Sequence, residues 1–175
     1  MTRYPPIQIV DQADQPVGRA SLTEAYEQGL PHRVIYVIVE DTDDKVLLQK
    51  RGPNVATYPG CWDISTAGHV DEGETYELAA RRELAEELGM NDEGFELEEL
   101  GKYYDENVIN GFRLNRFRKT YKVVIQAGTT LRPHLTELSG IRWLSIAEVK
   151  KLAADHPDKI AIGLRQCLEE HYSKT

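Results

Sequence analysis

The chain has 175 residues, a formal net charge of −8 at pH 7 and only two cysteines, Cys61 and Cys167. This length predicts one domain over residues 1–175 with a core large enough to need no disulfide or metal for folding. The acidic balance argues against duplex nucleic acid and anionic membranes as partners, because both require clustered lysine and arginine. No apolar run reaches the roughly 18 residues of a transmembrane helix and no signal peptide is recognisable, so we expect a cytoplasmic protein with reduced thiols.

The first 30 residues predict a β-hairpin followed by a short helix. Residues 7–10 form the first expected strand, residues 11–16 a turn, and Val17 begins the returning strand. Ser21 and Glu24 have the spacing of a capping box, which predicts a helix that ends near Gly29.

The middle of the chain predicts several strands and one long helix. The continuous apolar and β-branched residues within 33–40 indicate a buried central strand. The expected strands cover 33–40, 45–50, 62–67, 95–104 and 116–126, and the expected helix covers 74–88 and stops at Gly89. A loop over 52–60 separates the expected strands over 45–50 and 62–67. A polar stretch over 105–111 joins the expected strands over 95–104 and 116–126.

The C-terminal part predicts a short strand over 141–144 and then helices within 145–175. Ser145 and Glu148 form a second capping box, and Pro157 lies near the expected first turn of a last helix that reaches about Tyr172. Strands that surround one central helix and precede two more predict an α/β (α+β) fold with a mixed β-sheet between helices.

Three glutamates dominate the central helix. Glu83, Glu86 and Glu87 are spaced i, i+3 and i+4, so their carboxylates share one face and repel one another by about 0.2–0.5 kcal/mol per pair. A solvated acidic face, a neighbouring arginine (Arg81 or Arg82) or a hard divalent cation such as Mg²⁺ would each account for this arrangement.

The residues around this face form a longer pattern. It reads Gly68, five residues, Glu74, seven residues, and then Arg82-Glu83-Leu84-Ala85-Glu86-Glu87-Leu88-Gly89-Met90. This pattern resembles the Nudix box of the Nudix hydrolases and matches it at every specified position. The resemblance implies a Nudix-type α/β/α sandwich in which residues 68–90 form a loop–helix–loop. It also implies Mg²⁺ or Mn²⁺ as cofactor and, as substrate, a nucleoside diphosphate linked to another moiety or a related organic pyrophosphate.

The same resemblance assigns roles to individual residues. Glu83, Glu86 and Glu87 become the catalytic residues and metal ligands, with the Gly68 carbonyl as a further ligand. Glu74 and Arg82 become a structural pair that orients this face. Bound metal would screen the pyrophosphate charge and lower the pKa of an attacking water. The general base stays open among the three box glutamates and two glutamates outside the box, Glu106 and Glu137.

Segments outside the box resemble the isopentenyl-diphosphate isomerase branch of the same superfamily. The similar segments are Leu30-Pro31-His32-Arg33, Leu48-Gln49-Lys50-Arg51, and Pro59-Gly60-Cys61-Trp62 ahead of Gly68-His69. In those isomerases a catalytic cysteine directly precedes the Gly-His pair, where this chain has Ala67. They also bind a metal through several histidines and through glutamates on a later strand. His32 and His69 match two of these ligands, but the later strand carries Arg116 and Arg118.

The sequence thus predicts an isomerase-like scaffold with hydrolase chemistry. Arg51, His69 and Arg118 are the expected contacts to the diphosphate of a small-molecule substrate, and whether His32 and His69 bind metal is left open. Two alternatives to the hydrolase are an isopentenyl-diphosphate isomerase and a non-catalytic nucleotide-binding Nudix module. A homodimer is compatible with the sequence.

Overall fold

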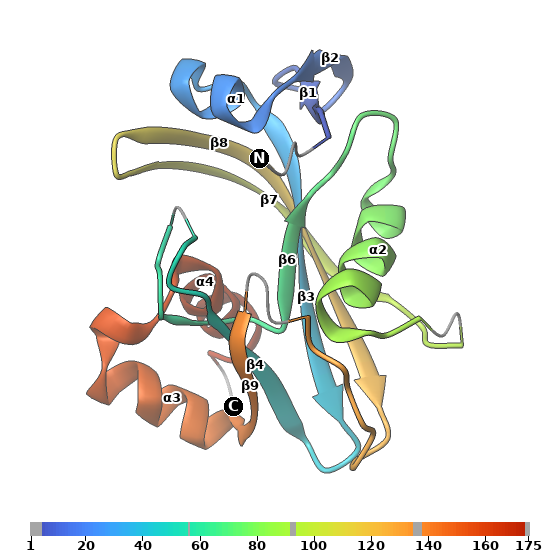
Figure 1. Ribbon diagram of the computed structural model, residues 1–175, viewed down its shortest axis with the longest axis vertical. Coiled ribbons are helices and arrows are strands. Elements are labelled where there is room, and N and C mark those ends of the chain that lie inside the picture. Colours follow the sequence, from blue (N-terminus) through green and yellow to red (C-terminus); the bar gives the residue numbers. More distant parts are fainter. Residues whose placement is uncertain (1–4, 56, 92–93, 135–137, 174–175) are drawn as a thin grey trace.

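The computed structural model describes residues 5–55, 57–91, 94–134 and 138–173, and within them a mixed sheet of nine strands with four α-helices (Figure 1). The strands are β1 (Ile7–Val10), β2 (Pro16–Ala20), β3 (His32–Asp41), β4 (Lys45–Arg51), β5 (Trp62–Asp63), β6 (Thr66–His69), β7 (Glu98–Ile109), β8 (Phe112–Ile125) and β9 (Leu138–Ser145). The helices are α1 (Leu22–Gln28), α2 (Tyr76–Leu88), α3 (Ile146–Asp155) and α4 (Ile162–His171), with a 3₁₀ turn over Pro157–Lys159.

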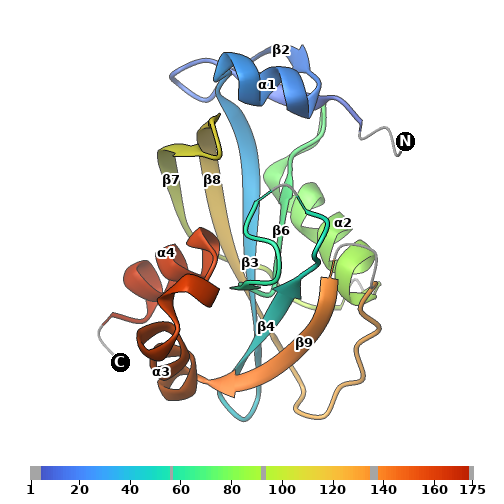
Figure 2. The same ribbon diagram turned by 60° about the vertical axis from the view of Figure 1, so that its left-hand side comes forward.

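Strand β3 is the centre of the sheet. It pairs antiparallel with β1, β4 and β6, and parallel with β8 from His32–Arg116 to Asp41–Ile125. Figure 2 shows β1, β2 and α1 at one end of this long strand and α3 and α4 toward the other end. All but two residues of β3 are buried, as its apolar, β-branched sequence predicts.

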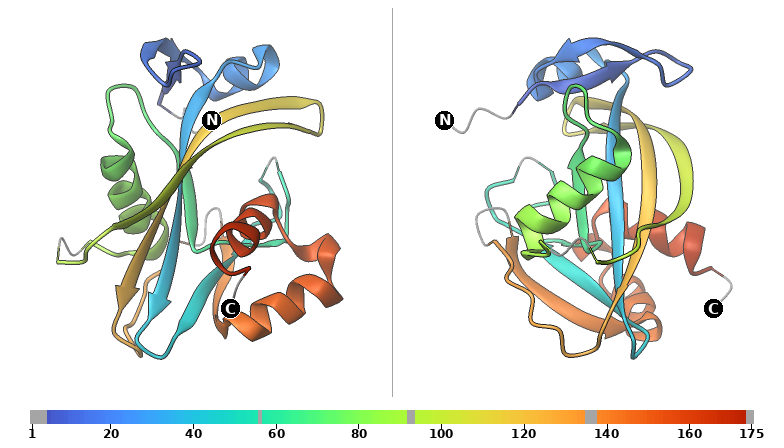
Figure 3. Two further views of the ribbon diagram at one scale, coloured as in Figure 1. Left: turned by 180° about the vertical axis from the view of Figure 1, so that it is seen from behind. Right: turned by 90° about the vertical axis from the view of Figure 1, so that its right-hand side faces the viewer.

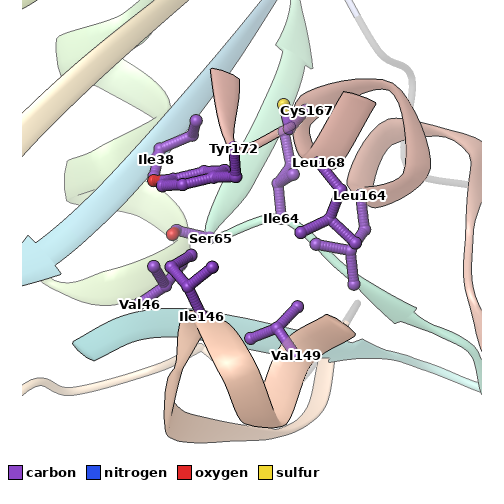
Figure 4. A pocket seen from close by; sticks show the side chains of 10 residues that line it. All are labelled: Ile38, Val46, Ile64, Ser65, Ile146, Val149, Leu164, Cys167, Leu168 and Tyr172. Atoms are coloured by element: carbon purple, nitrogen blue, oxygen red, sulfur yellow. The ribbon is translucent and has the colours of Figure 1, made fainter. Parts of the chain in front are cut away.

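The two faces of β3 carry separate hydrophobic cores. Ile35 and Val37 pack with α2 in one core, whereas Tyr36 and Ile38 pack with α3 and α4 in the other. Figure 3 shows α2 and the pair α3–α4 on opposite sides of the sheet. The expected α/β/α sandwich is therefore confirmed. Figure 4 shows the small apolar space between the sheet, α3 and α4, where Cys167 is buried.

The predicted strand over 62–67 is wrong, because the chain breaks it into β5 and β6. The break is at Ser65, whose hydroxyl donates to the Leu47 carbonyl (2.7 Å) and accepts from the Val39 amide (2.8 Å). One side chain thus bridges β3 and β4 where the two strands separate. That role depends on strands distant in sequence, so the local pattern does not show it.

The predicted polar connection over 105–111 is also wrong, because β7 and β8 extend through it as one long hairpin. The turn consists of Asn110 and Gly111, with φ of 52° and 83°, as a two-residue type I′ turn requires. The Asn-Gly pair was the available signal. The polar residues of 105–109 alternate between half-buried and exposed positions and therefore lack an apolar strand pattern.

The last helix begins at Ile162, later than the expected start near Pro157. Its N-cap, Ala161, has no capping side chain. The carboxylate of Asp63 instead accepts from the Leu164 amide (3.1 Å). A Cβ at Gly163 would lie 2.6 Å from Asp63 Oδ1, so glycine makes room for this distant cap.

Asp14 fastens the N-terminal hairpin to the rest of the fold. Its carboxylate is 4% exposed, accepts from Arg33 Nε (2.6 Å) and Tyr76 Oη (2.9 Å), and forms an ion pair with Lys102. Burial raises the pKa of Asp14, but the hydrogen bonds from Lys102, Arg33 and Tyr76 outweigh it and lower the pKa below its usual value. The ionised carboxylate therefore stabilises the fold above pH 4, and this stabilisation is lost as the pH falls through the lowered pKa.

We predict that Asp14→Asn lowers the free energy of unfolding by about 2–4 kcal/mol at pH 7, because the largely buried Arg33 and the more exposed Lys102 lose their anion. Chemical denaturation measures this difference, which should shrink below about pH 4, where the wild-type carboxylate is itself protonated. Asp43→Asn at an exposed turn is the control and should change little. A pH-independent difference would contradict the role given to the Asp14 charge.

Candidate active site

Helix α2 presents the three box glutamates. Thr75 caps its start by accepting from the Leu78 amide (3.2 Å), and Gly89 ends it in the left-handed conformation with φ of 70°. Its buried residues pack against β3 and β6, and Glu83 comes to lie against Gly68. A Cβ on Gly68 would overlap the carboxylate of Glu83, so only glycine permits this approach.

Arg82 connects the loop, the helix and the strand of the site. Its Nε and Nη2 donate to the two carboxylate oxygens of Glu74 (2.9 and 3.0 Å), which is the expected structural pair. Nη1 donates to Glu83 (2.7 Å) and Glu86 (3.3 Å), and Nη2 also donates to the His69 carbonyl (2.9 Å). Burial raises the pKa of Glu74, but the hydrogen bonds from Arg82 and the Asp71 amide outweigh it and lower the pKa.

The glutamates differ in their surroundings. The Glu83 side chain is 13% exposed, that of Glu86 is 60% exposed, and Glu87 accepts from the Thr66 hydroxyl. Arg82 partly offsets their mutual repulsion. No cluster of three histidine, cysteine or acidic side chains in metal-binding arrangement occurs among the described residues.

Carboxylate oxygens nevertheless fit a hard cation such as Mg²⁺ or Mn²⁺ by donor type. They lie beside a glycine that allows close approach to the strand. The ligand roles of Glu83, Glu86, Glu87 and the Gly68 carbonyl stay predictions.

Two residues expected to bind substrate contact other parts of the protein. Arg51 donates to Asp63 (3.2 Å) and to the carbonyl and hydroxyl of Thr57 (2.9 and 3.2 Å), which fastens the loop after β4. Arg118 is fully buried and binds Asp105 (2.7 Å) and Glu170 (2.6 Å), which ties β8 to β7 and α4. Their substrate contacts stay predictions, and these protein contacts give both arginines a structural role.

His32 and His69 lie together, with ring centroids 5.6 Å apart. His69 Nε2 is 2.9 Å from Tyr26 Oη, and His32 Nδ1 is 2.8 Å from the Leu30 carbonyl. Burial lowers the pKa of His32 to about 4 and that of His69 well below its usual value, so both are neutral at pH 7. The sequence offered no local signal for Tyr26, because α1 brings it here from outside the box.

The pairing of β6 with β3 places these histidines and the glutamates on opposite faces. Gly68 pairs with Ile35, whose side chain is in the core under α2, whereas Ala67 pairs with Tyr36 on the α4 side. His69, which pairs with Val34, shares the α4 side with Ala67 because alternate strand residues point the same way.

The other candidates lie apart from the box. Cys61 is buried, and its Sγ lies 3.6 Å from the Asp158 carbonyl on the segment before α4. Glu106 lines a surface pocket on the β7–β8 hairpin. Glu137 lies outside the described residues. No described helix is long and apolar enough to cross a membrane.

Comparison with known proteins identifies the family of the chain. The model of the NUDIX domain matches residues 30–163, and the chain therefore belongs to the Nudix family. An isopentenyl-diphosphate Delta-isomerase of Nocardia farcinica is 31% identical over 165 residues, which cover 94% of this chain and 93% of that protein.

Partial and structural similarities extend the comparison. An uncharacterized Nudix hydrolase of Pseudomonas aeruginosa is 39% identical over 83 residues, about half of each chain. The crystal structure of DR0079 from Deinococcus radiodurans superimposes with a TM-score of 0.72 and 23% identity over 93% of this chain and 98% of its own. This last likeness concerns the fold alone.

We predict that Gly68→Ala displaces the Glu83 carboxylate and leaves the fold intact, because the overlap is with the end of a flexible side chain. Affinity for Mn²⁺, measured by calorimetry, should fall about tenfold or more. Mn²⁺ should also raise the melting temperature of the wild type, and a chelator should reverse this. Gly18→Ala, where a Cβ meets nothing within 4 Å, is the control. Unchanged Mn²⁺ affinity in Gly68→Ala would contradict this arrangement.

Proposed function

We propose that this Nudix protein hydrolyses a diphosphate bond in a nucleoside diphosphate linked to another moiety, or in a related organic pyrophosphate, with Mg²⁺ or Mn²⁺. The observation that carries the proposal is the complete set of box glutamates on one face of α2. Glu83 lies against Gly68, and Arg82 holds both Glu83 and Glu86. None of the residues specified by the pattern is replaced.

The chain's own residues have distinct parts in this reaction. Glu83, Glu86 and Glu87 would hold the metal, and a bound divalent cation supplies charge screening and an acidified water. Arg82 fixes Glu83 and Glu86 relative to the strand, because the same guanidinium binds Glu74 and the His69 carbonyl. Thr66 orients Glu87 by donating a hydrogen bond from its hydroxyl to the Glu87 carboxylate. Preorganised groups of this kind reduce the cost of reorganisation during the reaction.

An isopentenyl-diphosphate isomerase is the second candidate, because the similarity to such an enzyme covers nearly the whole chain. Residue 67 weighs against it. Ala67 directly precedes Gly68-His69 and has no ionisable group for the proton transfer that the cysteine of the resembling enzymes supports. Arg116 weighs against the accompanying metal cage, since its fixed charge repels a cation. A non-catalytic nucleotide-binding module is the third candidate, and the intact glutamates disfavour it.

We expect Glu83→Gln and Glu87→Gln each to lower metal-dependent hydrolysis by roughly 100-fold or more with the fold retained, because a charged ligand is lost and shape is kept. The assay separates by chromatography the two monophosphate-containing products that cleavage of the diphosphate bond releases from nucleotide sugars, dinucleoside polyphosphates, NADH, coenzyme A and ADP-ribose. Glu77→Gln, on the same helix in an ion pair with Arg81, is the matched control and should stay active. Wild-type rates in either box variant would exclude the proposed site.

Isopentenyl diphosphate should stay unconverted when incubated with the protein and Mg²⁺ or Mn²⁺, since Ala67 cannot transfer a proton. Proton NMR for the dimethylallyl product measures this directly. Conversion at enzymatic rates would favour the isomerase, and Cys61→Ser would then test whether that thiol has taken the acid role. Absence of both conversion and hydrolysis, with nucleotide binding retained, would favour the non-catalytic module.

A further inference from the structure

Arg116 of β8 is a buried cation that forms no ion pair within the described part of the chain. The residue is only 8% exposed, and its Nε and Nη2 have no hydrogen-bond partner among the described residues. The described part of the chain also gives it no ion pair within 4.0 Å. Two donors of this guanidinium are thus buried without an acceptor among the described residues, which is unfavourable for folding.

Arg118, two residues along the same strand face, shows the contrast. It binds Asp105, Glu170 and Thr120. Asp105 faces Arg116 across the β7–β8 pairing, yet its oxygens accept from Arg118 and from Gln166 Nε2 (3.0 Å). The nearest acidic residue in the register is therefore committed elsewhere.

His32 lies directly opposite Arg116 in the β3–β8 pairing and is fully buried. Its Nδ1 must carry the proton, because that atom is 2.8 Å from the Leu30 carbonyl, which can only accept. In the neutral ring Nε2 is then an acceptor, and no described residue donates to it. Burial, followed by the charge of Arg116, opposes protonation of this histidine.

Two further rings surround this pair. His69 stacks on His32, and Tyr26 lies 5.6 Å from His32 between ring centroids. Because of strand alternation, His32, Ala67, His69 and Arg116 share the sheet face opposite to Gly68 and Glu83. The cluster is thus separate from the glutamate face.

The unused atoms define the ligand. Arg116 offers N–H donors and a positive charge, so its partner is an oxyanion. His32 Nε2 offers a lone pair, so a single partner that reaches both residues would also donate a proton. A carboxylate or sulfate has no proton to donate at neutral pH, and a metal cation would be repelled by Arg116.

We propose that Arg116 and His32 form a binding site for a monohydrogen phosphate group, in which P–O⁻ accepts from Arg116 and P–OH donates to His32 Nε2. In the resembling isomerases the corresponding strand positions belong to a metal cage. In this chain the positive charge is built into the protein, and the site takes an anion instead. The proposal concerns binding alone and does not rest on the hydrolytic reaction.

Inorganic phosphate and sulfate distinguish this site, because the monohydrogen phosphate ion has the shape and charge of sulfate and in addition carries a proton. The full chain is studied at pH 7 in EDTA, so that no divalent metal at Glu83, Glu86 and Glu87 can bind the phosphate. Phosphate should raise the melting temperature and bind in calorimetry, and sulfate should do so at least about tenfold more weakly. No stabilisation by phosphate, or equal stabilisation by sulfate, overturns the proposal.

Substitution assigns the effect to residues. Arg116→Met should abolish the response to phosphate, and without phosphate its melting temperature should equal or exceed that of the wild type, because an unpaired buried charge is removed. His32→Phe keeps a ring and should abolish the preference for phosphate over sulfate, which tests the proposal even if Arg116→Met folds poorly. Arg113→Met, at an exposed position of the same strand, is the control. A phosphate response that persists in Arg116→Met, or a preference for phosphate over sulfate that persists in His32→Phe, refutes the site.

Discussion

The guanidinium of Arg82 is the interaction on which the candidate active site depends. One planar group binds the Glu74 carboxylate of the preceding loop, two glutamates of α2 and a backbone carbonyl of β6. Loop, helix and strand are thus held together by charge-assisted hydrogen bonds. The same contacts reduce the repulsion between carboxylates, so α2 can carry an acidic face in the absence of a metal. A lysine, with a single point charge, could not make this set of contacts.

Strand β6 divides the chemistry of the molecule in two. Its short sequence alternates, so that Thr66 and Gly68 face α2 while Ala67 and His69 face α4. On the first side the glutamates and Arg82 form an acidic surface, in which Glu83 lies against Gly68 and Arg82 binds the His69 carbonyl. On the second side Arg116 and neutral histidines form a buried basic cluster. The proposed hydrolysis of a diphosphate would use both, since a metal and an anion need opposite charges.

The likeness to isomerases and the chemistry of individual residues point in different directions. Similarity to an isopentenyl-diphosphate isomerase, at 31% identity, extends over 94% of this chain. The residues on which the isomerase resemblance depends differ in charge and in the ability to transfer protons from what that resemblance implies. Ala67 cannot titrate, and Arg116 has a fixed positive charge that repels a cation.

Sequence alone determined those features whose physics is local. The buried strand β3, the capped helix α2 and the shared face of the box glutamates each follow from residues that are close together in the sequence. Tertiary structure decided the rest. Asp63 caps α4 by accepting from the Leu164 amide, 101 positions away. Ser65 interrupts a strand because it bridges two other strands, and Arg118 forms an ion pair with Glu170 of α4. A buried polar group needs a hydrogen-bond partner, and only the folded chain determines which groups are near enough. For Nε and Nη2 of Arg116, no described residue is.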